Sequence, residues 1–108
     1  MKLGFATAIL PDTPFHEIVD FASEQGFQCL EVMCWPKGKA ERRYAGITHI
    51  DVDTLDERKA SEINATLKGK GLEISALAYY PNPLDSDLDK RQTVVSHLKR
   101  VIAGAKVL

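Results

Sequence analysis

The chain has 108 residues, of which 44% are hydrophobic, and its 14 basic and 15 acidic side chains give a net charge of −1. This length allows one domain at most, and the hydrophobic fraction is ordinary for a chain that forms a core. The charge balance lacks the basic patch of a nucleic-acid or anionic-membrane binder, and no apolar run is long enough to span a bilayer. We therefore expect one domain with neither nucleic acid nor membrane as a partner.

The first strand is predicted over Lys2–Ile9, a short apolar run that ends before Pro11. It is too short for a signal peptide, so we expect a cytoplasmic protein. Thr13 and Pro14 have the residue types of a helix N-cap and first helical position. Apolar residues then recur at helical spacing, and Gly26 is predicted to end this helix.

The second strand is predicted over Cys29–Trp35, which is almost continuously apolar and has Glu31 as its only charge. A strand of this kind is buried on both faces, which favours a parallel sheet covered by helices. A long connection, 36–52, follows. Arg42 and Arg43 in this connection fit a solvated surface better than a phosphate site.

The second helix is predicted to be capped by Asp51 or Asp53 and to end at the glycines near Lys70. A third strand is predicted over Leu72–Tyr80, and a third helix is capped within Asp85–Asp87. This last helix has the most regular apolar stripe of the chain, formed by Val94, Val95, Leu98, Val101, Ile102 and Ala105.

Alternating strands and helices of this length predict right-handed βαβ units and an α/β fold. The pattern of Gly26–Val32 also recurs at Gly71–Leu77. The units average about 35 residues, close to the roughly 31 of an eight-unit barrel. We therefore expect residues 1–108 to form the first three βα units of a (β/α)8 TIM barrel, with helices outside a parallel sheet, truncated before the fourth strand. A flavodoxin-like sheet with helices on both faces is the alternative.

Strand alternation predicts the direction of the side chains. On the second strand, Leu30, Val32 and Cys34 are predicted to face the helices, whereas Glu31 faces the barrel interior and Trp35 lies at the rim. On the third strand, the residues predicted to face the helices are Leu72, Ile74, Ala76 and Ala78. Those predicted to face inward are Glu73, Ser75, Leu77 and Tyr79.

Active sites of such barrels lie at the C-terminal strand ends, which makes Glu31, Trp35, His49, Tyr79 and Asn82 candidate substrate-binding residues. A buried carboxylate needs a partner, so Glu31 either forms a structural ion pair or hydrogen bond inside the barrel, or contacts a sugar hydroxyl or a catalytic neighbour. Trp35 offers an apolar plate for a sugar face, or packs at the rim. Asn82 forms a turn or binds a ligand. His49, in the long connection, is a candidate to contact the pocket. Of the two adjacent tyrosines, Tyr79 is favoured over Tyr80 to face the pocket.

No catalytic residue or metal ligand is assigned from these patterns, because no combination of residues has a trustworthy spacing. Cys29 and Cys34 are predicted to be free, buried thiols, since they lack the geometry of a disulfide and the spacing of a zinc site. His16 and His97 lie on predicted helices and are predicted to be solvated.

Several segments together resemble the sugar phosphate isomerase/epimerase family of the xylose isomerase-like TIM barrel superfamily. They are Lys2–Thr7, Cys29–Trp35, Gly71–Leu77, Tyr80–Leu84 and Gly104–Leu108. The resemblance covers the whole chain. It implies an enzyme that isomerises or epimerises a sugar, sugar phosphate or polyol by enediolate-type proton transfer with a divalent metal such as Mn, Mg, Co or Zn.

The metal ligands of this family are Glu, Asp and His residues on later strands, so none is transferred to this chain. Glu31, Trp35 and the rim of the third strand map onto the pocket wall as supporting residues. This chain alone is therefore expected to be inactive. The alternatives are a non-catalytic βα fragment and an endonuclease IV-like phosphodiesterase barrel. Whichever interpretation holds, the 108-residue chain by itself has open sheet edges, which predict self-association.

Overall fold

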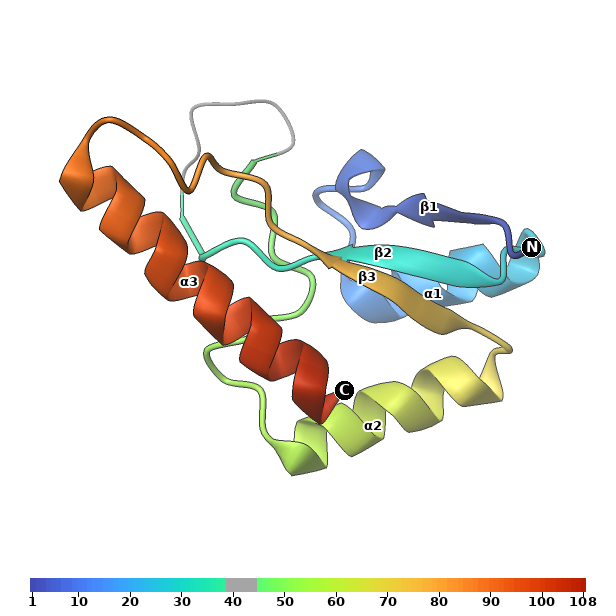
Figure 1. Cartoon of the computed structure of the whole chain (residues 1–108). Coiled ribbons are helices and arrows are strands. Elements are labelled where there is room, and N and C mark those ends of the chain that lie inside the picture. Colours follow the sequence, from blue (N-terminus) through green and yellow to red (C-terminus); the bar gives the residue numbers. More distant parts are fainter. Residues whose placement is uncertain (39–44) are drawn as a thin grey trace.

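Three parallel strands alternate with helices in the computed structural model, which describes residues 1–38 and 45–108 (Figure 1). The strands are β1 (Gly4–Ala6), β2 (Cys29–Met33) and β3 (Glu73–Ala78), and their order across the sheet is β1-β2-β3. The predicted α/β class and parallel sheet are confirmed. A flavodoxin-like sheet places its first strand between the second and the third, so the central position of β2 contradicts that alternative.

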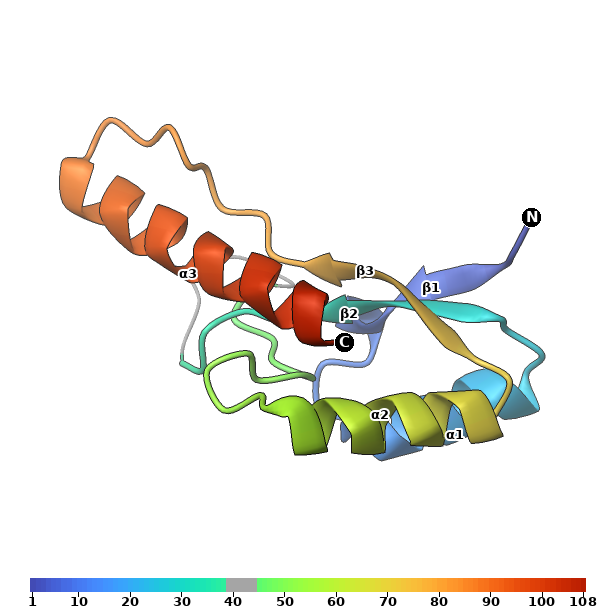
Figure 2. The same cartoon turned by 60° about the horizontal axis from the view of Figure 1, so that its bottom comes forward.

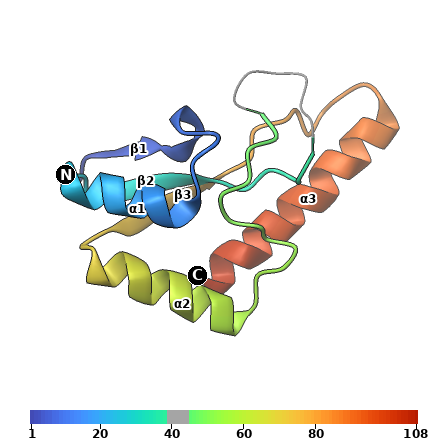
Figure 3. The same ribbon diagram turned by 180° about the vertical axis from the view of Figure 1, so that it is seen from behind.

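The helices are α1 (Phe15–Glu24), α2 (Glu57–Gly69) and α3 (Leu88–Val107), and a short 3-10 helix, η1 (Thr7–Ile9), follows β1. Figure 2 shows α1 and α2 beneath the same face of the sheet. Figure 3 shows α3 far from α1 and inclined to α2. None of these helices combines the length and the apolarity that a bilayer crossing requires.

Carboxylates cap α2 and α3, and only the cap of α3 was correctly predicted. α1 begins at Phe15 after Pro14 and has no side-chain cap, so the prediction of Thr13 as its N-cap is wrong. Asp87 caps α3 as expected, since its side chain accepts from two backbone N–H groups of the first turn. The cap of α2 is Asp56, whose carboxylate accepts from the backbone N–H of Lys59 at 2.8 Å. Asp51 instead accepts from the backbone N–H of Asp53 at 3.0 Å and so shapes the preceding turn. The prediction of Asp51 or Asp53 as the cap is therefore wrong.

The core lies between the sheet and the helices, on the face of β2 that alternation predicts. Leu30, Val32 and Cys34 are completely buried there. All three helices contribute to the same core cluster, with Ile18, Val19, Ala22, Leu67 and Val101. One continuous apolar core therefore holds the three βα units together.

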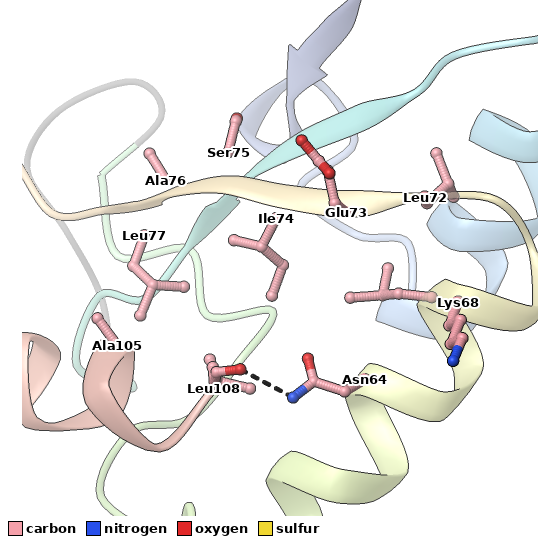
Figure 4. A pocket seen from close by; sticks show the side chains of 11 residues that line it. Asn64, Lys68, Leu72, Glu73, Ile74, Ser75, Ala76, Leu77, Ala105 and Leu108 are labelled. Carbon is pink, nitrogen blue, oxygen red and sulfur yellow. Dashed lines mark hydrogen bonds between the residues drawn. The ribbon is translucent and has the colours of Figure 1, made fainter. Parts of the chain in front are cut away.

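A β-bulge interrupts the pairing of β3 with β2. Leu30 pairs with Ile74, and the next residue, Glu31, pairs with Ala76, so Ser75 is an extra residue in β3. Figure 4 shows the result, with Ile74 pointing to the helix side and both Ser75 and Ala76 pointing away from it. An extra residue reverses the direction of every side chain that follows it.

This reversal makes the predicted directions wrong beyond the bulge. Leu77 and Tyr79 pack against the helix-side core, although alternation placed them inward. Ala78 packs with Met33 and Ala8 on the opposite face, although it was predicted to face the helices. Ala76, which pairs with Glu31, points away from the helices for the same reason, although it was predicted to face them.

α3 buries a narrower line of residues than its sequence predicts. The buried residues are His97, Val101 and Gly104, whereas Ile102 is 61% exposed. A Cβ at Gly104 would lie 3.0 Å from Cγ1 of Val52, which shows how closely the helix approaches the connection after β2. The burial of His97 contradicts its predicted solvated position. The rest of the predicted apolar stripe is only partly covered.

Candidate functional site

A group of polar and aromatic side chains gathers where β2 and β3 end. We call Thr7, Trp35, His49, Tyr79 and His97 the strand-end cluster. Thr7 begins η1, Trp35 and Tyr79 follow β2 and β3, and His97 lies on α3. Three of the five were predicted as candidate binding residues, and the structure brings them together with two that were not.

The Thr7 hydroxyl links β2 to the connection that carries His49. Its oxygen accepts from the backbone N–H of Met33 at 3.0 Å, and it lies 2.8 Å from Nδ1 of His49. Nε2 of His49 lies 3.2 Å from the carbonyl oxygen of Leu10. A carbonyl oxygen can only accept a hydrogen bond, so Nε2 carries a proton. In the neutral ring Nδ1 then accepts a hydrogen bond from the Thr7 hydroxyl.

The surroundings of His49 favour its neutral ring. Burial lowers its pKa below the ordinary value, and the neighbouring carbonyls of Leu10 and Thr13 only partly oppose this effect. Because both ring nitrogens already have partners in the chain, His49 fixes the geometry of the strand ends. Neither nitrogen is left to bind a metal or a substrate unless this network breaks.

A stack of three rings continues the cluster to α3. The ring centroids of Trp35 and Tyr79 are 5.1 Å apart, and those of Tyr79 and His97 are 4.5 Å apart, both in edge-to-face geometry. Nε2 of His97 donates to the carbonyl oxygen of Cys34 at 2.7 Å, and Nη2 of Arg100 lies 3.3 Å from its Nδ1. Burial raises the pKa of Tyr79 above its ordinary value, although the Arg100 charge opposes this.

Trp35 contains a buried donor that lacks an acceptor. Its indole N–H has no hydrogen-bond partner among the described residues, and the atom is inaccessible to solvent. The backbone of Trp35, by contrast, is fixed by two hydrogen bonds. Its backbone N–H donates to the carbonyl oxygen of Ile47 at 3.2 Å, and its carbonyl oxygen accepts from the Thr48 hydroxyl at 2.6 Å. A buried donor without a partner costs about 1–3 kcal/mol, so an oxygen that reached this N–H would be favoured.

Glu31 lies on the sheet face opposite the helices. Its neighbours on the adjacent strands are Ala6 and Ala76, whose side chains are small, and Glu31 is only partly buried. No salt bridge within residues 1–38 and 45–108 involves it. The structural ion pair considered from the sequence is therefore not formed with any described residue.

The remaining candidates differ in their surroundings. Asn82 is exposed, and its Oδ1 accepts from the backbone N–H of Leu84 at 2.9 Å, so it forms an Asx turn. Tyr80 is 60% exposed, whereas Tyr79 lies between two rings. Arg42 and Arg43 lie outside the described residues.

No described group of three His, Cys, Asp or Glu side chains converges in a way that could hold a metal ion. Cys29 and Cys34 are free and buried, as predicted, and burial raises the pKa of Cys34 to about 12. A neutral thiol is a poor metal ligand. The described residues therefore do not fit the divalent metal that the family resemblance implies.

The comparisons with known proteins identify no family. No protein-family model matches the sequence. A search of curated proteins also finds no match. The family resemblance therefore depends only on the sequence segments that carry it.

Proposed function

We propose that residues 1–108 are the first three βα units of a (β/α)8 barrel that isomerises or epimerises a sugar or sugar phosphate. The observation that carries this proposal is the consecutive strand order combined with one core shared by all three helices. In a barrel each strand pairs with the next along the chain, and right-handed crossovers put every helix on the outer face. The sugar class comes from the family resemblance, and the net charge of −1 favours it over a nucleic acid.

In this proposal Glu31 and Trp35 form one wall of the substrate pocket. Glu31 lies on the face that becomes the barrel interior, and its carboxylate accepts hydrogen bonds from sugar hydroxyls. Trp35 lies beyond the end of β2, where its ring packs against a sugar face. Tyr79 and His49 hold this wall in place from behind.

These residues bind and orient a sugar, but they supply no metal site and no proton-transfer group. The divalent metal of the family would need ligands that the described residues do not provide. The 108-residue chain is therefore expected to bind sugars weakly, with a dissociation constant of roughly 1–10 mM, and to show no turnover.

The indole N–H resonance of Trp35 provides a direct test, because this is the only tryptophan in the chain. We expect D-fructose 6-phosphate or D-xylose to shift this resonance saturably, and Glu31→Gln to weaken the binding. Glu62→Gln, which removes an exposed carboxylate from α2, is the matched control and should leave the binding unchanged. Inorganic phosphate alone separates sugar binding from phosphate binding. The proposal fails if neither sugar shifts the resonance, or if Glu31→Gln leaves the affinity unchanged.

A second measurement tests the barrel itself. The intact mass of the protein isolated from its natural source should lie well above 12.0 kDa if further βα units complete the barrel. A mass near 12.0 kDa would contradict the assignment to a complete isomerase while leaving the sugar-binding test unaffected.

A further inference from the structure

The free edge of β3 borders a hollow of about 370 Å³. Figure 4 shows Ile74 and Leu77 pointing into it from β3, with Ala105 of α3 and Leu108, the residue that follows this helix, on the other side. The amide of Asn64 on α2 donates to the carbonyl oxygen of Leu108 at 2.8 Å and closes the hollow opposite the strand. An open strand edge beside an apolar hollow is a surface to which another strand can add.

The exposed side of α3 next to this hollow has one apolar residue between two positive charges. Ile102 is 61% exposed, and Lys99 and Lys106 lie three residues before it and four residues after it. This spacing puts the three side chains on one side of the helix. Ala105, on the adjoining side, lines the hollow. No salt bridge among the described residues involves either lysine.

The opposite edge of the sheet has the same pattern with the opposite charge. Phe21 on α1 is 43% exposed, and Glu17 and Glu24 lie four residues before it and three residues after it. Phe21 packs edge-to-face on Phe5 of β1 at 6.1 Å, so Phe21 lies on the β1 side of the sheet, whereas Glu24 lies within Coulombic range of Lys70 at the end of α2. Leu3, directly before β1, is 66% exposed.

We propose that a second copy of this chain docks its β1 edge, in parallel, against the β3 edge of the first. In that arrangement α1 of the second copy lies beside α3 of the first and runs in the same direction. Each pair of charges spans seven residues, or about 10 Å of helix. Glu17 then lies opposite Lys99, and Glu24 lies opposite Lys106. Phe21 meets Ile102 between the two ion pairs.

Charge complementarity is the argument for a second copy in this parallel orientation. Antiparallel pairing of two β3 edges would bring the lysines of two α3 helices together, and these like charges would repel each other. A β3-to-β1 contact is heterologous, so each added copy presents a new free β3 edge, and the assembly either closes into a ring or continues. The inference does not depend on the proposed activity, and it concerns the 108-residue chain by itself, because a fourth strand of the proposed barrel would pair with the same β3 edge.

A charge-swap experiment tests this interface. Light scattering and sedimentation velocity of the 108-residue chain should give a mass above 12.0 kDa that falls as salt rises. Glu17→Lys combined with Glu24→Lys should reduce association at least tenfold, and so should Lys99→Glu combined with Lys106→Glu. An equimolar mixture of the two double variants should regain association, because the mixture restores opposite charges at one interface.

The matched control is Glu57→Lys combined with Glu62→Lys on α2, which makes the same change in net charge away from both edges. Circular dichroism confirms that each variant is folded before its mass is measured. A monomeric wild-type chain at 100 μM would overturn the proposal. So would acidic-side variants that associate as strongly as the control, or a mixture that remains monomeric.

Hydrogen exchange provides an independent readout of the same contact. The N–H of Glu73 donates to Gln28 on the β2 side, so strand alternation directs the N–H of Ile74 to the open edge. We expect exchange at Ile74 to slow as the protein concentration rises. Exchange at Ile74 that does not depend on concentration would show that the β3 edge remains unpaired and would also overturn the proposal.

Discussion

Deleting Ser75 should leave the fold intact, although the deletion lies in the middle of a strand. Ser75 has no partner on β2, and Ile74 and Ala76 already pair with consecutive residues of β2. Removing Ser75 therefore gives a regular ladder in which Leu77 and Tyr79 still face the core. We expect the free energy of unfolding to change by no more than about 1 kcal/mol.

Deleting Leu77 instead should be severe, because it shortens the same strand by one residue but moves every later side chain to the wrong face. Leu77 leaves the core, Ala78 takes its place and Tyr79 turns away from His97. Losing a partly buried leucine costs at least about 2 kcal/mol, and losing the aromatic contact costs about 0.5–1.5 kcal/mol more. The expected loss is therefore about 3 kcal/mol.

Urea unfolding followed by far-ultraviolet circular dichroism compares these two deletions. Each deletion shortens the chain by one residue, so the Leu77 deletion is the control for the Ser75 deletion. All samples need the same protomer concentration, since association shifts apparent stability. The assignment of the bulge would be refuted if removing Ser75 destabilised the chain as much as removing Leu77.

Three further predictions concern single side chains. His97→Leu removes the donor to the buried Cys34 carbonyl and should lower the free energy of unfolding by about 1–3 kcal/mol. The control, His16→Leu at a 74% exposed site, should change the free energy of unfolding by less than about 0.5 kcal/mol. Equal effects of the two substitutions in urea titrations would contradict the burial of His97. Because the folded-state pKa of His49 is lowered, the unfolded chain takes up a proton first as the pH falls below about 6.5, so stability should be full above that pH and decline below it. His49→Gln should weaken this decline in unfolding curves recorded between pH 7.5 and 5.5, and an unchanged pH profile would exclude His49 as its source. A Cβ at Gly4 would collide with the Cys29 carbonyl of the neighbouring strand, so Gly4→Ala should cost about 1–3 kcal/mol, and thermal melts that match the wild type would show that β1 can move away without loss.

Periodicity predicted the order of strands and helices and the helix-facing side of β2, because these features depend on neighbouring residues. The bulge at Ser75 could not be predicted, since the apolar pattern continues through it without a glycine or a proline. The cap at Asp56 competed with two other aspartates within five residues, and only the position of the following helix decides among them. Local rules therefore described the elements better than their exact register.

The strand-end cluster shows the same limit. Trp35 and Tyr79 were identifiable because they lie at the C-terminal ends of predicted strands. His97 had a usable signal, since it lies three residues after Val94 and four before Val101 and thus within the apolar stripe of its helix. The contact of Thr7 with His49 spans 42 positions of sequence and left no local pattern.

The burial of Cys34 makes its thiol a built-in probe of conformational opening. Burial raises the pKa of this thiol to about 12, so very little thiolate is present at pH 8 and an alkylating reagent reacts negligibly with the closed protein. His97 donates to the Cys34 carbonyl, and Val101 of α3 belongs to the same buried cluster as Cys34, so we expect this thiol to become exposed when α3 leaves the end of β2. The rate of Cys34 alkylation under native conditions therefore measures how often that helix separates from the sheet, without an added label.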